Sequence, residues 1–139
     1  MDLQQVREEI AELLRTVPDL RAHPYNPDPG ALHFPAAVIM EAVPDYNTTF
    51  GATTTTVRFA VALMAGGQIT RATQQRLDGW LANTGPYSVR AALEEAAGYQ
   101  SFDDLSVEAV DATGFEDVAE LGFFGATLTV AVHVSEEQP

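Results

Sequence analysis

The sequence predicts an α+β domain with a mainly antiparallel sheet of about four strands, helices packed on one face and a helix at the N-terminus. Residues 53–65 and 124–134 both alternate apolar and polar side chains, which is the period of a strand with one buried face. Between them, residues 69–96 change to helical spacing, interrupted at Gly85-Pro86. Two long strands with matching alternation are natural antiparallel neighbours, so we expect the helices to lie across one face of their sheet.

The N-terminal helix is predicted from apolar side chains at helical spacing between Leu3 and Val17. Asp2 is expected to cap it, and Pro18 to end it because a proline cannot continue a helix. The charged residues on its other side are interpreted as a solvent-exposed face; they are Glu8, Glu9, Glu12 and Arg15. A short strand is expected within residues 20–25, followed by a proline-rich loop over residues 26–32.

Residues 36–42 are predicted to form a strand because β-branched residues lie at its centre. The next segment, residues 43–52, contains proline, Asp, Asn and Gly and is predicted to be a hairpin connection longer than a tight turn. Tyr46 and Phe50 lie inside it. Each is either an anchor folded back on the domain or a surface aromatic for a partner. We favour an anchor for Phe50 and leave Tyr46 open.

The second half of the chain supplies two helices and two strands. A helix over residues 69–81 is expected to bury Ile69, Ala72, Arg76, Leu77, Trp80 and Leu81, which makes Trp80 a core residue. A second helix follows over residues 89–96. Residues 105–112 are a predicted strand, residues 113–120 a predicted break, and residues 135–139 a frayed end. The Gly-Phe-Phe-Gly segment at 122–125 is interpreted as a bulge or bend.

Composition limits the function classes. A chain of 139 residues is most simply one domain, residues 1–139, large enough to bury about 70% of the surface that its unfolded form exposes. It has no cysteine, which excludes disulfides, thiolate metal sites and cysteine nucleophiles. No apolar run approaches the roughly 20 residues of a membrane span, and the N-terminus is acidic, so we expect a protein made in the cytosol without membrane contact.

The charge balance is the most unusual property of the sequence. Twenty acidic residues against seven basic ones give a formal net charge of -13, and the basic residues are all arginine. Tight wrapping of a phosphate backbone is disfavoured, because that binding needs a dense cationic surface. Repulsion also keeps copies apart, so any assembly must be driven by good packing or triggered by a partner. Acidity alone does not indicate a function, and a role in keeping the protein soluble explains the high net charge equally well.

Motifs for catalysis and for cofactor or metal binding are missing from the sequence. The three histidines, His23, His33 and His133, are scattered, and no HExxH or HxH spacing occurs. Neither a nucleophile elbow nor a phosphate-binding glycine loop is present. The neighbouring pairs Asp103-Asp104 and Glu94-Glu95 point apart and are poor candidates for paired acid and base catalysis. We therefore expect a protein that is not an enzyme and that uses no cofactor or metal.

Interaction is the remaining function class. Arg71, Arg76 and Arg90 are concentrated in the helical segment, whereas many acids lie within residues 103–120 and 136–137. One copy could present these arginines to the acids of another, in a head-to-tail arrangement that closes into a ring. The alternative is that each arginine pairs within its own chain or faces water.

The order and spacing of several segments resemble the tail terminator proteins of long-tailed actinobacterial phages, a family that includes minor tail and head-tail joining proteins. The segments are VPDLRAHPY, PDYNTTFGATTTTVRFAVALMAG, RATQQRLDGWLANTGPYSVRAALE and LGFFGATLTVAVHV, and together they cover nearly the whole chain. No single motif is chemically diagnostic; the combination carries the resemblance, especially the QxRLDxxLxxxGPxSVxxAL pattern.

The resemblance implies a virion protein of the tail and neck, assembled in the host cytoplasm. It implies a hexameric ring that caps the head-proximal end of the tail tube, stops its growth, contacts head-completion and neck proteins, and lets DNA pass without specific binding. The predicted subunit or partner contacts are Tyr46, Phe50, Arg71, Arg76, Arg90, Glu116 and Asp117. The predicted lumen-facing acids are Asp103, Asp104 and Glu120. The alternatives are another connector of the neck, such as a head-completion or stopper protein, and a cytosolic ligand-binding or enzymatic α+β domain.

Overall fold

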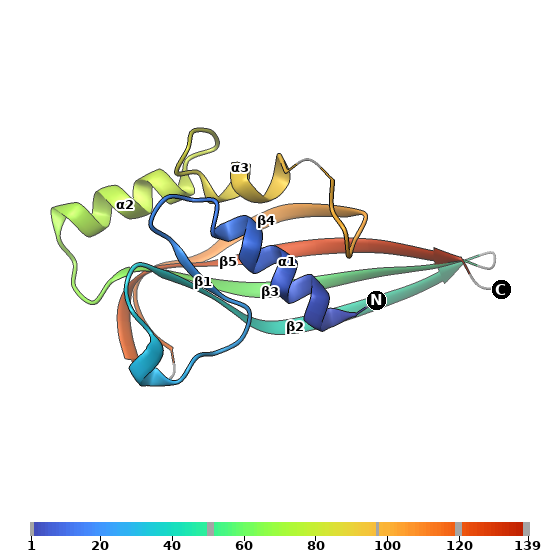
Figure 1. Ribbon diagram of the computed structural model, residues 1–139, viewed down its shortest axis with the longest axis horizontal. Coiled ribbons are helices and arrows are strands. Elements are labelled where there is room, and N and C mark those ends of the chain that lie inside the picture. Colours follow the sequence, from blue (N-terminus) through green and yellow to red (C-terminus); the bar gives the residue numbers. More distant parts are fainter. Residues whose placement is uncertain (1, 50–51, 97, 119–120, 138–139) are drawn as a thin grey trace.

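The computed structural model describes residues 2–49, 52–96, 98–118 and 121–137. Within these residues the chain forms a five-stranded mixed sheet, in the order β1-β2-β3-β5-β4, and three α-helices that lie on one face of it (Figure 1). The predicted α+β class is confirmed. In chain order the elements are α1 (Leu3–Leu14), β1 (Arg21–His23), the 3-10 helix η1 (Pro29–Ala31), β2 (Ala36–Thr49), β3 (Ala52–Gly66), α2 (Arg71–Leu81), α3 (Val89–Glu94), β4 (Asp104–Val118) and β5 (Leu121–Glu137).

The sheet has one strand more than predicted. The expected short strand near residue 22 is β1, and it joins the sheet in parallel with β2, from the pair Arg21 and Ala36 to the pair His23 and Val38. The remaining neighbours pair antiparallel. The sheet is therefore mixed, because β1 reaches β2 by way of the loop that contains η1 rather than by a hairpin.

The centre of the sheet is the predicted pair of long strands, β3 and β5. They pair antiparallel from Ala52 and Glu137 to Gly66 and Phe124. The apolar positions of both strands, such as Phe59 and Val130, are fully buried under the helices. The alternation in the sequence therefore predicted both the pairing and the buried face correctly.

Two predicted breaks are wrong, because the strands continue through them. β2 extends to Thr49, and Pro44 lies in register with Val57 of β3. A proline is tolerated here because β1 pairs only with residues 36–38, so the rest of β2 is an edge that needs no outward N–H donor. β4 likewise extends through residues 113–118. Pairing along β3 and β5 overrides the local turn signals of both segments.

The two hairpins extend in opposite directions. The residues next to the β2–β3 connection lie level with the C-terminal end of β5, as the pairing of Ala52 with Glu137 shows. Next to the β4–β5 connection, Val118 pairs with Leu121, which lies beyond Phe124, the partner of the last residue of β3. At the first end, residues 45–49, 52–56 and 133–137 form a projection that we call the arm, which runs past the N-terminal end of α1 (Figure 1).

The helices begin at side-chain caps. Asp2 accepts hydrogen bonds from the N–H groups of Gln4 and Gln5, at 3.0 and 3.3 Å, which confirms the predicted cap of α1. Thr70 and Thr73 cap α2 reciprocally, so this helix starts after Ile69, which is 56% exposed. The buried side of α2 is therefore narrower than the sequence predicted. Leu77 and Trp80 are buried and Leu81 is partly buried, but Ala72 and Arg76 are exposed. The second predicted helix is α3, which ends at Glu94.

Two of the charged residues that were interpreted as a solvent-exposed face also make structural contacts: Glu9 in α1, which is partly buried, and Arg15, the C-cap of α1, which is exposed as predicted. The carboxylate of Glu9 accepts hydrogen bonds from the N–H groups of Gln100 and Ser101, at 2.9 and 2.8 Å. The guanidinium of Arg15 donates to the carbonyl of Ala22 at 2.9 Å. Glu9 therefore holds the connection before β4 against α1, and Arg15 holds β1 against the C-terminal end of α1.

A smaller apolar cluster lies on the other face of the sheet, close to η1. It consists of Leu32, Ala36, Val38, Ala62, Met64 and Phe123, with Phe34 and Met40 packed against it. Elsewhere this face carries small polar side chains, such as Thr56, whose hydroxyl lies 3.0 Å from Nδ1 of His133. We call this side of the sheet the open face.

The β3–β5 pairing depends on a glycine. A Cβ atom on Gly125 would overlap the backbone carbonyl of Leu63, beside a register shift between Met64 and Gly66. The bulge that the sequence analysis placed at residues 122–125 lies instead on the partner strand β3, while residues 122–125 pair regularly with β4.

We expect Gly125→Ala to destabilise the protein by at least about 3 kcal/mol or to prevent folding, because a rigid backbone atom cannot move aside. Urea unfolding followed by circular dichroism measures the change. Gly30→Ala is the control, since a Cβ there meets nothing within 4 Å, and it should unfold like the wild type. Equal stability of the two variants would show that β3 and β5 are not packed this closely.

Candidate interaction surfaces

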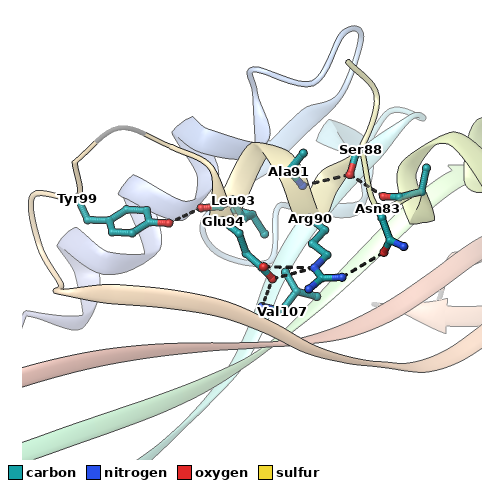
Figure 2. A network of polar contacts seen from close by, with 9 residues as sticks. Asn83, Ser88, Arg90, Ala91, Leu93, Glu94, Tyr99 and Val107 are labelled. Carbon is teal, nitrogen blue, oxygen red and sulfur yellow. Dashed lines mark hydrogen bonds and ion pairs between the residues drawn. The ribbon is translucent and has the colours of Figure 1, made fainter. Parts of the chain in front are cut away.

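The outer edge of the sheet at β4 is fastened to α3 by a polar network. Glu94 accepts a hydrogen bond from the N–H of Val107 at 2.9 Å, and Nε of Arg90 donates to the same carboxylate at 3.2 Å. Nη1 of Arg90 also donates to Oδ1 of Asn83 at 3.1 Å (Figure 2). The hydroxyl of Ser88 caps the start of α3 through the N–H of Ala91. This network connects α3 to the segment after α2 and to β4, and it occupies one outward N–H of that edge strand.

Beside this network lies an open groove of about 190 Å³. Trp80, Leu81 and Leu128 supply its apolar lining, and residues 107–110 of β4 form one wall. Val110 in this wall is 47% exposed. The groove offers apolar surface together with the charged side chains of Arg90 and Glu108, a composition that suits contact with a protein segment.

The arm is the second candidate surface. Tyr46 is 70% exposed and lies in register with the buried Thr55. Since directly paired residues of antiparallel strands share a face, Tyr46 lies on the helix side of the sheet. The sequence left its role open, and the structure shows a surface aromatic. An exposed tyrosine provides both apolar area and a hydroxyl for a partner.

The arginines are mostly engaged within the chain. Six of the seven make hydrogen bonds in the described part of the protein, Arg71 being the seventh. Arg76 donates to the carbonyl of Ala65 at 2.8 Å, and Arg90 belongs to the network at β4. Both still have exposed surface. Their predicted contact with another copy remains a prediction, as does that of Arg71.

The predicted acidic positions are spread over the molecule. Asp103 accepts a hydrogen bond from the N–H of Ser135 at 2.8 Å, so its carboxylate anchors the base of the arm. Asp104 is exposed and lies in register with His133 at the open face. Glu116 and Asp117 belong to β4 near its hairpin end, and their side chains lie outside the description. Phe50 and Glu120 lie outside the described residues.

A ligand-binding domain would need polar and aromatic side chains that converge on one pocket, and Tyr46, Trp80 and His133 do not converge. Trp80 is 2% exposed and packs in the core under the helices, as predicted. His133 contacts Thr56 on the open face, whereas Tyr46 lies on the helix side of the arm. These three residues therefore do not form a shared ligand site.

Sequence reasoning missed a cluster of arginines around β1. Arg7 donates to the carbonyls of Pro24 and Ile39, at 3.0 and 3.1 Å, and stacks over Tyr25. Arg21 donates to the carbonyl of Phe34 at 3.1 Å. These carbonyls come from several segments of the chain, so no local pattern in the sequence could identify the cluster.

His23 in β1 has a buried Nε2 atom without a hydrogen-bond partner among the described residues. Burial lowers the pKa of His23 below its ordinary value of 6.5, and the positive charge of Arg15 lowers it further. The folded protein therefore favours the neutral imidazole.

No group of three or more potential metal ligands occurs among the residues that the structure describes. None of the described helices is long and apolar enough to cross a membrane. The chain matches no protein-family model and no curated protein.

Removing the carboxylate at residue 94 tests the network at β4. Glu94→Ala leaves the N–H of Val107 without its acceptor, so we expect a loss of about 1–3 kcal/mol in the free energy of unfolding. Chemical denaturation measures it. Glu95→Ala removes an exposed neighbouring carboxylate and should change stability little. A loss of the same size in both variants would show that the network does not hold β4.

The pH dependence of stability tests the environment of His23. Because the pKa is lower in the folded state, protons bind preferentially to the unfolded chain. Stability is therefore fully present above pH 6.5 and decreases as the pH falls from 6.5 toward the folded-state pKa. We expect His23→Gln to flatten this decrease between pH 6.5 and 5, measured by denaturant unfolding, whereas His33→Gln at an exposed position should retain it. An unchanged slope in His23→Gln would contradict this assignment.

Proposed function

We propose that this protein is a tail terminator, a subunit of a ring that caps the head-proximal end of a phage tail tube, stops its growth and joins the tail to the neck. The observation that carries the proposal is that the two hairpins lie at opposite ends of one sheet. A subunit between tube and neck needs a contact surface at each end. Residues next to both connections belong to strands that are held firmly by β3 or β5 pairing, so each surface has a rigid base.

The charge distribution is consistent with a channel for DNA. Among the described residues only Glu94 and Glu108 form ion pairs with arginine, and acids such as Asp45, Asp104 and Asp111 are exposed. An acidic lumen repels phosphate and prevents the contacts that release counterions and give affinity. In this proposal Asp104 faces the lumen from the open face. Asp103 contributes charge there while its carboxylate supports the arm, and Glu120 is the third acid of this set.

Two other functions compete with the terminator. A head-completion or stopper protein of the neck would use similar surfaces but would contact the portal side instead of the tube. A ligand-binding or enzymatic domain would use the groove at β4. Against the latter, the two described side chains with shifted pKa values, His23 and Tyr99, do not line that groove.

Electron microscopy of tubes polymerised from the partner tail-tube protein tests the proposal. Adding this protein should give short tubes that carry a six-fold ring at one end. Tubes of unchanged length without a cap would reject the terminator function. Binding to isolated portal or neck proteins in the same preparation would then favour the alternative connector.

The arm provides a test at residue level. We place it against the tube, so Tyr46→Ser should abolish capping in the tube-length assay while changing the free energy of unfolding by less than about 0.5 kcal/mol. Ile69→Ser is a matched control, because Ile69 is a similarly exposed apolar residue after the opposite end of β3. If Tyr46→Ser still caps tubes and Ile69→Ser does not, the subunit is oriented the other way on the tube. If both variants cap tubes, neither residue is an essential contact.

A further inference from the structure

We propose that copies of this chain join head to tail through the two opposite edges of the sheet, the arginine cluster beside β1 of one copy meeting the acidic strand β4 of the next. This inference rests on the proposed ring and names the surfaces that would close it. It differs from the contact expected from sequence, which involved Arg71, Arg76 and Arg90, because Arg21 is its central cation.

The cationic side is built from distant segments. Arg21 and Arg76 line one cleft of about 460 Å³ together with Asp19, Leu20, Phe34 and Pro35. Each arginine uses one Nη1 atom to hold a carbonyl, that of Phe34 or of Ala65. A guanidinium has five N–H donors, so both retain donors for a carboxylate. The carbonyl contacts fix the positions of both cations in advance.

The cleft has more positive than negative groups. Asp19 is the acidic residue in its lining, and it forms no ion pair with Arg21 or Arg76 among the described residues. Arg15, which holds the carbonyl of Ala22, adds a further cation at β1. In a protein with a net charge of -13, this local excess of arginine is a distinct cationic site.

The opposite edge of the sheet is acidic. β4 contains five acidic residues and no basic one: Asp104, Glu108, Asp111, Glu116 and Asp117. Glu108 is neutralised by Arg58, whose Nε lies 2.7 Å from its carboxylate. Asp111 is exposed and bonded to the neutral hydroxyl of Thr129. The edge therefore keeps a net negative charge that β1 of another copy can meet.

The strand register places the two charged sides at one level. Arg21 is in register with Ala36 of β2, which is in register with Met64 of β3. Met64 pairs with Gly125 of β5, and Gly125 pairs with Gly114 of β4. Arg21 and Gly114 therefore occupy the same level on opposite edges of the sheet.

Acidic residues flank this level on β4. Asp111 precedes Gly114, and Glu116 and Asp117 follow it. Copies arranged side by side without an axial shift would bring Arg21 of one copy close to this acidic stretch of the next. Since the two edges are different surfaces, the contact is heterologous and closes into a ring when the rotation per copy allows it.

Main-chain pairing between the two edges is obstructed, so side-chain charges have to provide the contact. Arg15 already occupies the carbonyl of Ala22 on β1, and Glu94 occupies the N–H of Val107 on β4. β4 also has register shifts after Val107 and after Val110, which interrupt a regular edge. A contact made of exposed ion pairs is weak in isolation and is weakened further by salt.

A charge-exchange experiment tests the inference. Arg21→Glu alone would set glutamate against Glu116, and Glu116→Arg alone would set arginine against Arg21. In an equimolar mixture of the two variants, alternating copies restore opposite charges at every interface. We expect each single variant to associate about tenfold more weakly than the wild type, and the mixture to recover that loss. Sedimentation equilibrium at low and at physiological ionic strength measures association, and circular dichroism checks that each variant is folded.

The matched control is each single variant alone at the same total concentration, in which every interface stays mismatched and association should not recover. Association of the complementary mixture no stronger than that of either variant alone, including the case in which all samples stay monomeric, would overturn the proposed contact. The tube-length assay on the same samples separates the two proposals. If the substitutions leave capping unchanged, the proposed contact is wrong and the proposed terminator function stands. If association recovers in the mixture but no sample caps tubes, the terminator function is wrong and the contact stands.

Discussion

The rest of the structure depends on the long antiparallel pairing of β3 with β5. It is close enough at Gly125 that the Leu63 carbonyl leaves no room for a side chain. One face of this pair, with residues such as Phe59 and Val130, gives the helices their core. The same two strands hold β2 and β4 on either side, so both hairpins gain a rigid base. Core packing and the surfaces offered to partners are therefore consequences of a single pairing.

The few arginines of this acidic chain mainly bind backbone carbonyls. Arg7, Arg15, Arg21 and Arg76 donate to backbone carbonyls where loops meet strands, and these contacts satisfy acceptors that the sheet leaves unpaired. Among the described acids, Asp2, Glu9, Glu94 and Asp103 accept hydrogen bonds from backbone N–H groups. Folding thus concentrates positive charge near β1 and leaves negative charge elsewhere, which produces two unlike sides from a sequence in which the charges look dispersed.

Sequence periodicity was sufficient for β3, β5, the cap at Asp2 and the burial of Trp80, because each depends on residues close together in the chain. It failed for residues 43–49 and 113–118, where cross-strand pairing overrides Pro44 and Gly114. It also could not find the cleft at Arg21, since the cleft forms only when β1 and α2 come together. Local signals predicted elements, whereas the candidate surfaces depend on contacts between distant segments.

The edges of the sheet explain why a protein that builds a ring need not aggregate. An unpaired edge strand is a template for uncontrolled strand addition. Here Pro44 interrupts the edge of β2, Arg15 occupies β1, and Glu94 with two register shifts interrupts β4. What remains between copies is a set of exposed charges. Their attraction is opposed by the mutual repulsion of chains that each carry a net charge of -13. Such a subunit associates only weakly when free and assembles fully where a template raises its local concentration, because there the complementary contacts outweigh the repulsion. Protected edges and a high net charge therefore confine assembly to the place where a partner already holds the copies side by side.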